Sequence, residues 1–124
     1  ISTLVESGRG LLAEDDEFAA LSAWLRATLV HGLTYRGLSA AVMSSALDRD
    51  RDVVSPWHAE MFEVGAALLE RARSSGAVVA DADATDVLKL IGAIAWAAQD
   101  APDGGAQADR LLGLVLNGLR RRPR

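Results

Sequence analysis

The sequence predicts an all-α protein, an antiparallel bundle of about six helices. Apolar residues recur every three or four positions through most of the chain, which is the period of a helix with one buried face. Several of these stretches begin at residues that cap helix N-termini or end at glycine. Only the short run 77–79 looks extended, and one isolated short strand makes no sheet. With 124 residues, 50 % of them hydrophobic, the chain is expected to form a single domain over 1–124.

The first helix is expected over 1–13, before an acidic cluster at 14–17 that suits the start of the next helix. Its apolar residues are Leu4, Val5, Leu11 and Leu12. Within it, 8–13 reads Gly-Arg-Gly-Leu-Leu-Ala and matches the G-x-G-x-x-A fingerprint of dinucleotide-binding proteins. The stretch 1–5 before it could pass for a strand, but the fingerprint also requires further parallel strands downstream. No second convincing strand occurs, so we do not expect a dinucleotide site.

The second helix, over 16–32, carries two parallel stripes. The buried stripe at the expected spacing consists of Phe18, Leu21, Leu25, Leu29 and Gly32. The second stripe is amphipathic and consists of Trp24, Thr28, His31 and Tyr35. It is either the edge of the core, with its polar tips satisfied, or a pocket wall, where a mostly apolar lining with a few polar groups orients a small ligand.

Two further helices are expected on either side of the charged loop 48–52. The first covers 33–47 and includes Met43. The second starts with Ser55 as N-cap and Pro56 as its first residue, runs to about Ser74 and stops at Gly76. Val78 is placed for the hydrophobic contact that closes such a helix end. The apolar stripe of this helix is Trp57, Met61, Val64 and Leu68, flanked by His58, Phe62 and Leu69.

The last two helices are expected over 83–99, with Asp83 as N-cap, and over about 106–121, with the breaker 101–105 between them. Both are apolar on most sides, and a chain of 124 residues is too short to enclose both. They form either a central core hairpin or a subunit interface. We expect the interface, a four-helix bundle in a homodimer, because a two-fold axis lets one patch complement itself. The expected contacts are Leu88, Ile91, Ala95, Leu111, Leu112, Val115 and Leu119.

Composition argues against several kinds of function. A net charge of −4 and a pI near 5.1 do not suit a chain that grips a phosphate backbone. The absence of cysteine removes disulfides, thiolate nucleophiles and cysteine-based zinc sites. Neither His31 nor His58 has a partner at ligand spacing, and no catalytic motif occurs, so we expect no metal, no cofactor and no enzyme activity. No apolar run is long enough for a membrane span and no signal peptide appears, so the cytoplasm is expected.

Nine short stretches, distributed along nearly the whole chain, together resemble the C-terminal regulatory domain of TetR-family bacterial transcription regulators. They are 24–26 (Trp-Leu-Arg), His31, 35–38 (Tyr-Arg-Gly-Leu), 68–72 (Leu-Leu-Glu-Arg-Ala), 75–78 (Ser-Gly-Ala-Val), 81–84 (Asp-Ala-Asp-Ala), 90–95 (Leu-Ile-Gly-Ala-Ile-Ala), 109–112 (Asp-Arg-Leu-Leu) and 117–120 (Asn-Gly-Leu-Arg). The resemblance implies that 1–13 is the end of the helix leading from an N-terminal helix-turn-helix domain that is missing here. It also implies that the last two helices dimerise, and that operator DNA is contacted only through the missing domain.

The function expected from this resemblance is a small-molecule-sensing and dimerisation domain of a transcriptional repressor. An unidentified effector that prefers one conformation would release the operator. The expected ligand-binding residues are Trp24, Thr28, His31, Tyr35, Met43, Trp57, Met61, Phe62 and Trp96. His31 and Tyr35 would hydrogen-bond the ligand while the others supply apolar contact. The alternative is a structural dimerisation module with the same helices and a filled interior.

Overall fold

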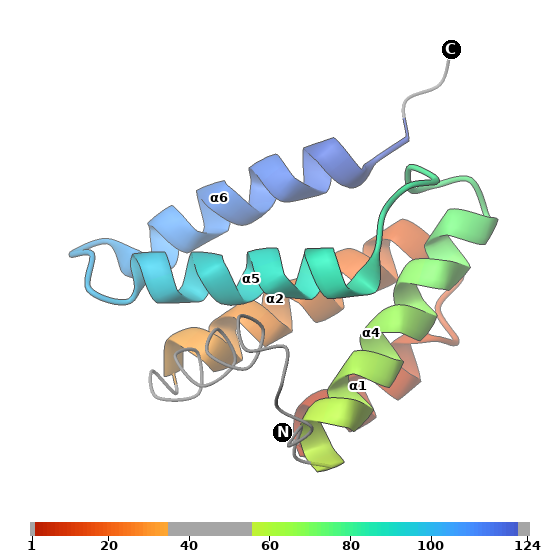
Figure 1. Cartoon of the computed structure of the whole chain (residues 1–124), viewed down its shortest axis with the longest axis horizontal. Coiled ribbons are helices and arrows are strands. Elements are labelled where there is room, and N and C mark those ends of the chain that lie inside the picture. The colour runs from red at the N-terminus through yellow and green to blue at the C-terminus, as the bar shows by residue number, and fades with distance from the viewer. Residues whose placement is uncertain (1, 35–55, 122–124) are drawn as a thin grey trace, which may run out of the picture.

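The computed structural model describes residues 2–34 and 56–121 of the chain. Within these ranges the chain forms five α-helices and no strand, which confirms the all-α prediction (Figure 1). They are α1 (Ser2–Leu11), α2 (Glu17–Thr34), α4 (Pro56–Ser74), α5 (Ala84–Ala98) and α6 (Gly104–Leu119). The helix expected over 33–47 falls almost entirely outside the described residues. None of the helices in the described ranges is long and apolar enough to cross a membrane.

Helix α2 lies at the centre of the described structure. It packs against α1, α4, α5 and α6, and Figure 1 shows α5 between it and α6, with α5 and α6 running antiparallel. Helices α1 and α4 pack against each other at one end of α2 (Figure 1). Because α2 has neighbours on several sides, both of its predicted stripes contribute to the core. Its buried residues are Ala20, Leu21, Trp24, Leu25 and Leu29.

Two aspartates cap helix starts: Asp83 was predicted as an N-cap, whereas Asp16 was expected as the first residue of its helix and lies just before α2. The Asp16 carboxylate accepts a hydrogen bond from the backbone N–H of Ala19 at 2.9 Å, at the start of α2. The Asp83 carboxylate accepts one from the N–H of Thr85 at 2.7 Å, at the start of α5. Each carboxylate thereby satisfies one of the backbone donors that a helix leaves unpaired in its first turn.

Helix α4 ends at Gly76 as predicted. This glycine has a φ of +84°, in the left-handed region that favours glycine. The N–H of Gly76 donates to the carbonyl of Arg73 at 3.0 Å, and the N–H of Ala77 donates to the carbonyl of Ala72 at 3.0 Å. Val78 then turns into the core, where it is 1 % exposed. These contacts form a Schellman motif with its hydrophobic closure.

The run 77–79 takes part in a contact that the sequence did not predict. The N–H of Val79 donates to the carbonyl of Leu119 at 2.9 Å, and the N–H of Arg121 donates to the carbonyl of Ala77 at 3.0 Å. These two bonds form an isolated antiparallel bridge between Val78 and Arg120. The bridge ties the end of α6 to the link between α4 and α5.

The last helix is shifted from its predicted bounds of about 106–121. It begins at Gly104 and ends at Leu119. A Cβ at position 104 would lie 2.5 Å from the carbonyl oxygen of Ala98, so glycine allows α6 to start directly against the end of α5. Asp103 occupies the N-cap position without a side-chain capping bond, and its carboxylate pairs instead with Arg110 at 3.2 Å.

Most residues predicted for the dimer interface are buried in the core of the protomer, and their part in a dimer interface stays a prediction. The buried ones are Leu88, Ile91, Ala95, Leu112 and Leu119, each at most 8 % exposed. Leu111 and Val115 are half-buried and pack against the same core. The wide apolar arcs of α5 and α6 do not by themselves show which of their sides faces the chain's own core.

Candidate functional site

Two residues of the predicted ligand-binding line on α2 already use their polar groups within the protein. Trp24 is completely buried, and its indole N–H donates to the backbone carbonyl of Leu4 at 3.1 Å. The hydroxyl of Thr28 is half-buried and donates to the carbonyl of Trp24 at 2.8 Å. The structure therefore places Trp24 in the core, which was the other interpretation of this stripe.

His31 lies one turn beyond Thr28 and is half-buried. Burial lowers the pKa of His31 below its usual value of 6.5, because a partly desolvated imidazolium is disfavoured. The side chain is therefore neutral at pH 7, with one ring nitrogen as a donor and the other as an acceptor. A neutral imidazole suits a polar, uncharged group of a ligand better than an anion.

The predicted ligand residues on α4 and α5 lie in different surroundings. Met61 is 5 % exposed and belongs to the core, while Phe62 is half-buried and packs against it. Trp96 is 54 % exposed, so within the protomer its side chain faces solvent and not the interior. The predicted role of Trp96 in ligand binding stays a prediction. Tyr35, Met43 and the side chain of Trp57 lie outside the described residues.

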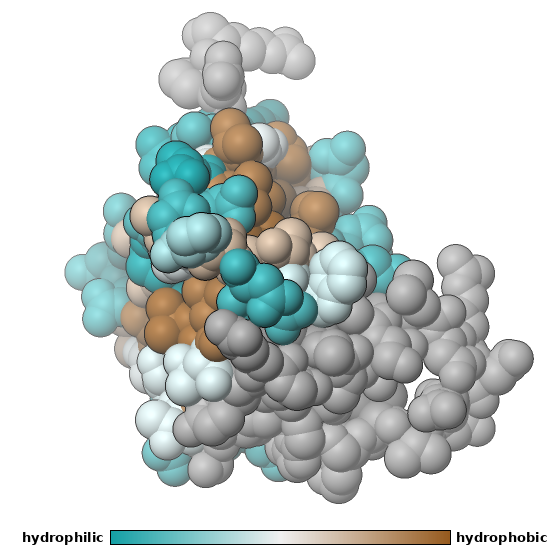
Figure 2. Space-filling model, turned by 90° about the vertical axis from the view of Figure 1, so that its left-hand side faces the viewer, coloured by the Kyte–Doolittle hydropathy of each residue, from teal (hydrophilic) through white to brown (hydrophobic). Residues whose placement is uncertain are grey.

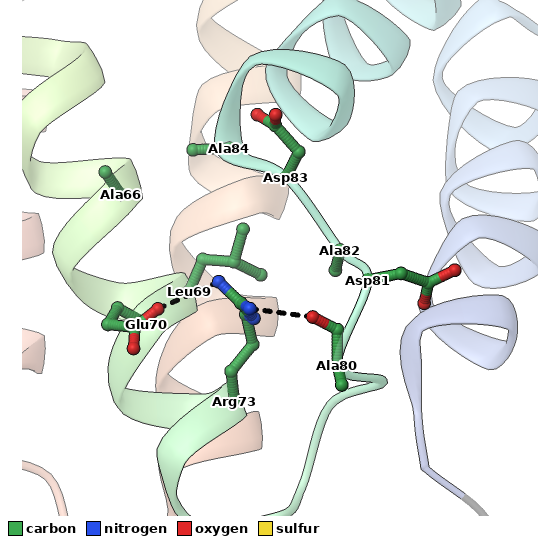
Figure 3. A pocket seen from close by; sticks show the side chains of 9 residues that line it. All are labelled: Ala66, Leu69, Glu70, Arg73, Ala80, Asp81, Ala82, Asp83 and Ala84. Carbon is green, nitrogen blue, oxygen red and sulfur yellow. Dashed lines mark hydrogen bonds and ion pairs between the residues drawn. The ribbon is translucent and has the colours of Figure 1, made fainter.

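A hollow of about 450 Å³ opens between the second half of α4 and the link to α5 (Figure 3). It is lined by Ala66, Leu69, Glu70, Arg73, Ala80, Asp81, Ala82, Asp83 and Ala84. The Arg73 guanidinium spans it, with bonds of 2.9 Å to the Glu70 carboxylate and 2.7 Å to the Ala80 carbonyl. None of the predicted ligand residues lines this hollow. No sequence pattern predicts this hollow, because it depends on how the link folds back against α4.

The last two helices expose large apolar side chains. Leu90 and Trp96 on α5 are 49 % and 54 % exposed, and Leu114 on α6 is 69 % exposed. A Cβ added at Gly113 or Gly118 would meet nothing within 4 Å. Figure 2 shows hydrophobic side chains among hydrophilic ones over the upper part of the molecule, where α6 lies. We call these five residues the α5–α6 surface.

Among the described residues, no group of three or more His, Cys, Asp or Glu side chains could hold a metal ion. The polar contacts that bridge helices are structural. The guanidinium of Arg26 on α2 pairs with Asp109 on α6, and that of Arg120 lies 4.5 Å from the centre of the Phe18 ring.

Comparisons with known proteins agree with this helical arrangement. Residues 16–121 match the family described as the C-terminal domain of SbtR-like transcriptional regulators. The structure is similar to the crystal structure of the TetR transcriptional regulator SCO0520 from Streptomyces coelicolor, with a TM-score of 0.77 and 31 % sequence identity. That similarity covers 98 % of this chain and 69 % of the Streptomyces chain. A search of curated proteins found no match.

The family match covers most of the chain, and the similarity in structure extends over nearly all of it at substantial sequence identity. Both agree with the helices described above, from the central α2 to the antiparallel pair α5 and α6. The chain therefore belongs to the TetR family of transcriptional regulators, and it corresponds to their C-terminal domain.

Proposed function

We propose that this chain is the small-molecule-sensing and dimerisation domain of a bacterial transcriptional repressor. The observation that carries the proposal is the match of residues 16–121 to the C-terminal domain of TetR-like regulators. Operator DNA is assigned to a helix-turn-helix domain that is not included in this sequence, in line with the acidic net charge of −4. As a repressor of bacterial genes, the protein would act in the cytoplasm.

The proposed effector site lies between the second half of α2 and the first half of α4. Thr28, His31 and Phe62 are its half-buried described members. Tyr35, Met43 and Trp57 complete the proposed lining, with Met61 and Trp24 behind it in the core. A neutral His31 beside apolar side chains favours an apolar effector that carries one uncharged polar group, because such a pocket orients its ligand through few hydrogen bonds.

A thermal-shift screen of apolar compounds with a hydroxyl or carbonyl group tests this site. A ligand at a hundredfold excess over its Kd adds about 2.7 kcal/mol of stability, which raises the midpoint of a domain of this size by roughly 10 °C. We expect this shift to fall in His31→Ala and to persist in Glu60→Ala, which changes an exposed residue of α4. A shift of the same size in all three proteins would contradict the site.

Dimerisation is assigned to the α5–α6 surface. Its exposed side chains Leu90, Trp96 and Leu114 would leave water on contact with a second copy, and burial of apolar surface drives association. Gly113 and Gly118 would let two helices approach closely there, since neither carries a side chain. A two-fold axis would then place the same surface of each protomer against the other.

A second candidate is a structural dimerisation module without an effector. The observation that favours it is that Trp24 and Met61 are packed in the core, and that the indole N–H of Trp24 is already paired. The thermal-shift screen separates the two candidates. A filled interior predicts that no compound raises the midpoint with increasing concentration, whereas a sensor predicts that at least one does.

A further inference from the structure

The indole ring of Trp24 spans the space between the backbones of α1 and α4. At one edge, its Nε1–H donates to the Leu4 carbonyl of α1 at 3.1 Å. At the other edge, a Cβ added at Gly65 of α4 would lie 2.9 Å from Cζ3 and 3.1 Å from Cη2 of the ring. The side chain is completely buried, so close packing holds the ring on all sides.

Gly8 makes this arrangement possible. In an α-helix, the side chain four residues after a carbonyl lies on the same face one turn further on. A Cβ at Gly8 would lie 2.7 Å from Nε1 of Trp24 and 2.2 Å from Cγ1 of Val64, so a side chain there would displace both the indole and α4. A Cβ at Gly10 would meet nothing within 4 Å. The glycine at position 8, which the sequence presented as part of a nucleotide fingerprint, thus serves helix packing.

The side of α4 that meets the ring also carries Phe62, a member of the proposed effector site, and Met61, which lies behind it in the core. Met61 and Phe62 precede Gly65 by four and three positions, which places them on the same face of α4. A second contact between α4 and the α1 region lies further along α4. There the Arg71 guanidinium donates a hydrogen bond to the backbone carbonyl of Glu14, in the link between α1 and α2. Helices α1 and α4 are therefore joined by the Trp24 side chain and by the contact between Arg71 and Glu14.

We propose that Trp24 is a positioning residue that transmits a displacement of α4 to α1, and that it does not itself bind the effector. The proposal rests on the proposed function in one respect, because it takes the effector to be what displaces α4. Helix α1 is the segment assigned to the connection with the DNA-reading domain. Its position relative to α4 would then determine whether that domain matches the operator.

Hydrogen exchange of backbone amides tests the coupling without any ligand. Gly65→Ala presses a methyl group against the indole and reproduces a displacement of α4, while Trp24→Phe keeps an aromatic ring but removes the N–H. We expect each variant to raise exchange of the α1 amides about fivefold, the effect of losing one hydrogen bond. The α6 amides should exchange as in the wild type. Gly10→Ala, on the open side of α1, is the matched control and should leave both helices unchanged.

The double variant that combines Gly65→Ala with Trp24→Phe tests whether both changes act through the same contact. Phenylalanine lacks the part of the indole, with atoms Cζ3 and Cη2, that lies against position 65. Gly65→Ala should therefore add little to the exchange of the α1 amides when Trp24→Phe is already present. Unchanged α1 exchange in both single variants would overturn the proposal, as would an equal rise in α1 and α6, which indicates general destabilisation. If Trp24→Phe does not fold, Gly65→Ala alone decides between these outcomes. If no compound raises the unfolding midpoint but the α1 amides exchange faster in the variants as expected, the effector site is contradicted and the coupling between α4 and α1 stands.

Discussion

At the scale of single residues, the position of a polar group inside the fold decides its role. Trp24 and His31 lie on one stripe of α2 in the sequence, yet the first is completely buried with its N–H paired and the second is half-buried. The stripe itself was predictable from the spacing of its residues. Which member joins the core was not, because this depends on Gly8 and Gly65, which lie on other helices and leave room for an indole ring.

His31 predicts a specific pH dependence of stability. Its pKa is lowered in the folded chain, so between that value and the ordinary 6.5 the unfolded chain binds more protons than the folded one. The free energy of unfolding should therefore decrease as the pH falls through this window. In His31→Gln, urea unfolding at pH 7.5 and pH 5 should show a smaller difference than in the wild type. Val30→Gln, which changes the exposed neighbour of His31, should keep the wild-type difference, and a loss there would count against our explanation.

At the scale of helices, the first and last residues of a helix were predictable from the sequence where a local motif defines them. Asp83 and Gly76 act as predicted, because a cap or a left-handed glycine depends only on its immediate neighbours. The start of α6 was predicted two residues late, because Gly104 was assigned to the breaker. Its role comes from the nearby carbonyl of Ala98, a contact that a periodic pattern does not contain.

The two aspartates at the starts of α5 and α6 should differ in their contribution to stability. Asp83→Ala removes a capping bond of 2.7 Å and should lower the free energy of unfolding by about 1 kcal/mol. Asp103→Ala removes only an exposed pair with Arg110 and should cost a few tenths of a kcal/mol, roughly the value of a surface ion pair. Denaturant unfolding of the two variants measures both values. Equal losses would show that the capping bond is not what distinguishes the two sites.

At the scale of the whole molecule, the described structure has one core centred on α2, with exposed apolar residues left on the last two helices. The sequence correctly indicated that α5 and α6 carry more apolar surface than the chain buries. It did not show which sides of these helices stay exposed, because Leu88, Ile91 and Leu112 pack inwards. The choice between core and partner is made by the packing of all the helices together, which no single helix pattern reveals.

The α5–α6 surface predicts the oligomeric state. We expect the wild-type chain to sediment as a dimer at micromolar concentration and Leu114→Glu as a monomer, because a carboxylate would be buried without a partner in the interface. Val30→Glu introduces the same charge at an exposed apolar residue of α2 and should remain dimeric. A monomeric wild type, or monomers in both variants, would contradict the assignment of this surface.

The claim that this domain senses a small molecule is tested most directly by a crystal structure of the chain with the strongest compound from the thermal-shift screen. We expect ligand density between α2 and α4, in contact with His31 and Phe62, in a cavity of about 300 Å³ or more. Trp24 should keep its hydrogen bond to the Leu4 carbonyl and make no contact with the ligand. Density in the hollow beside Arg73, or a closed interior between α2 and α4, would contradict the proposed site.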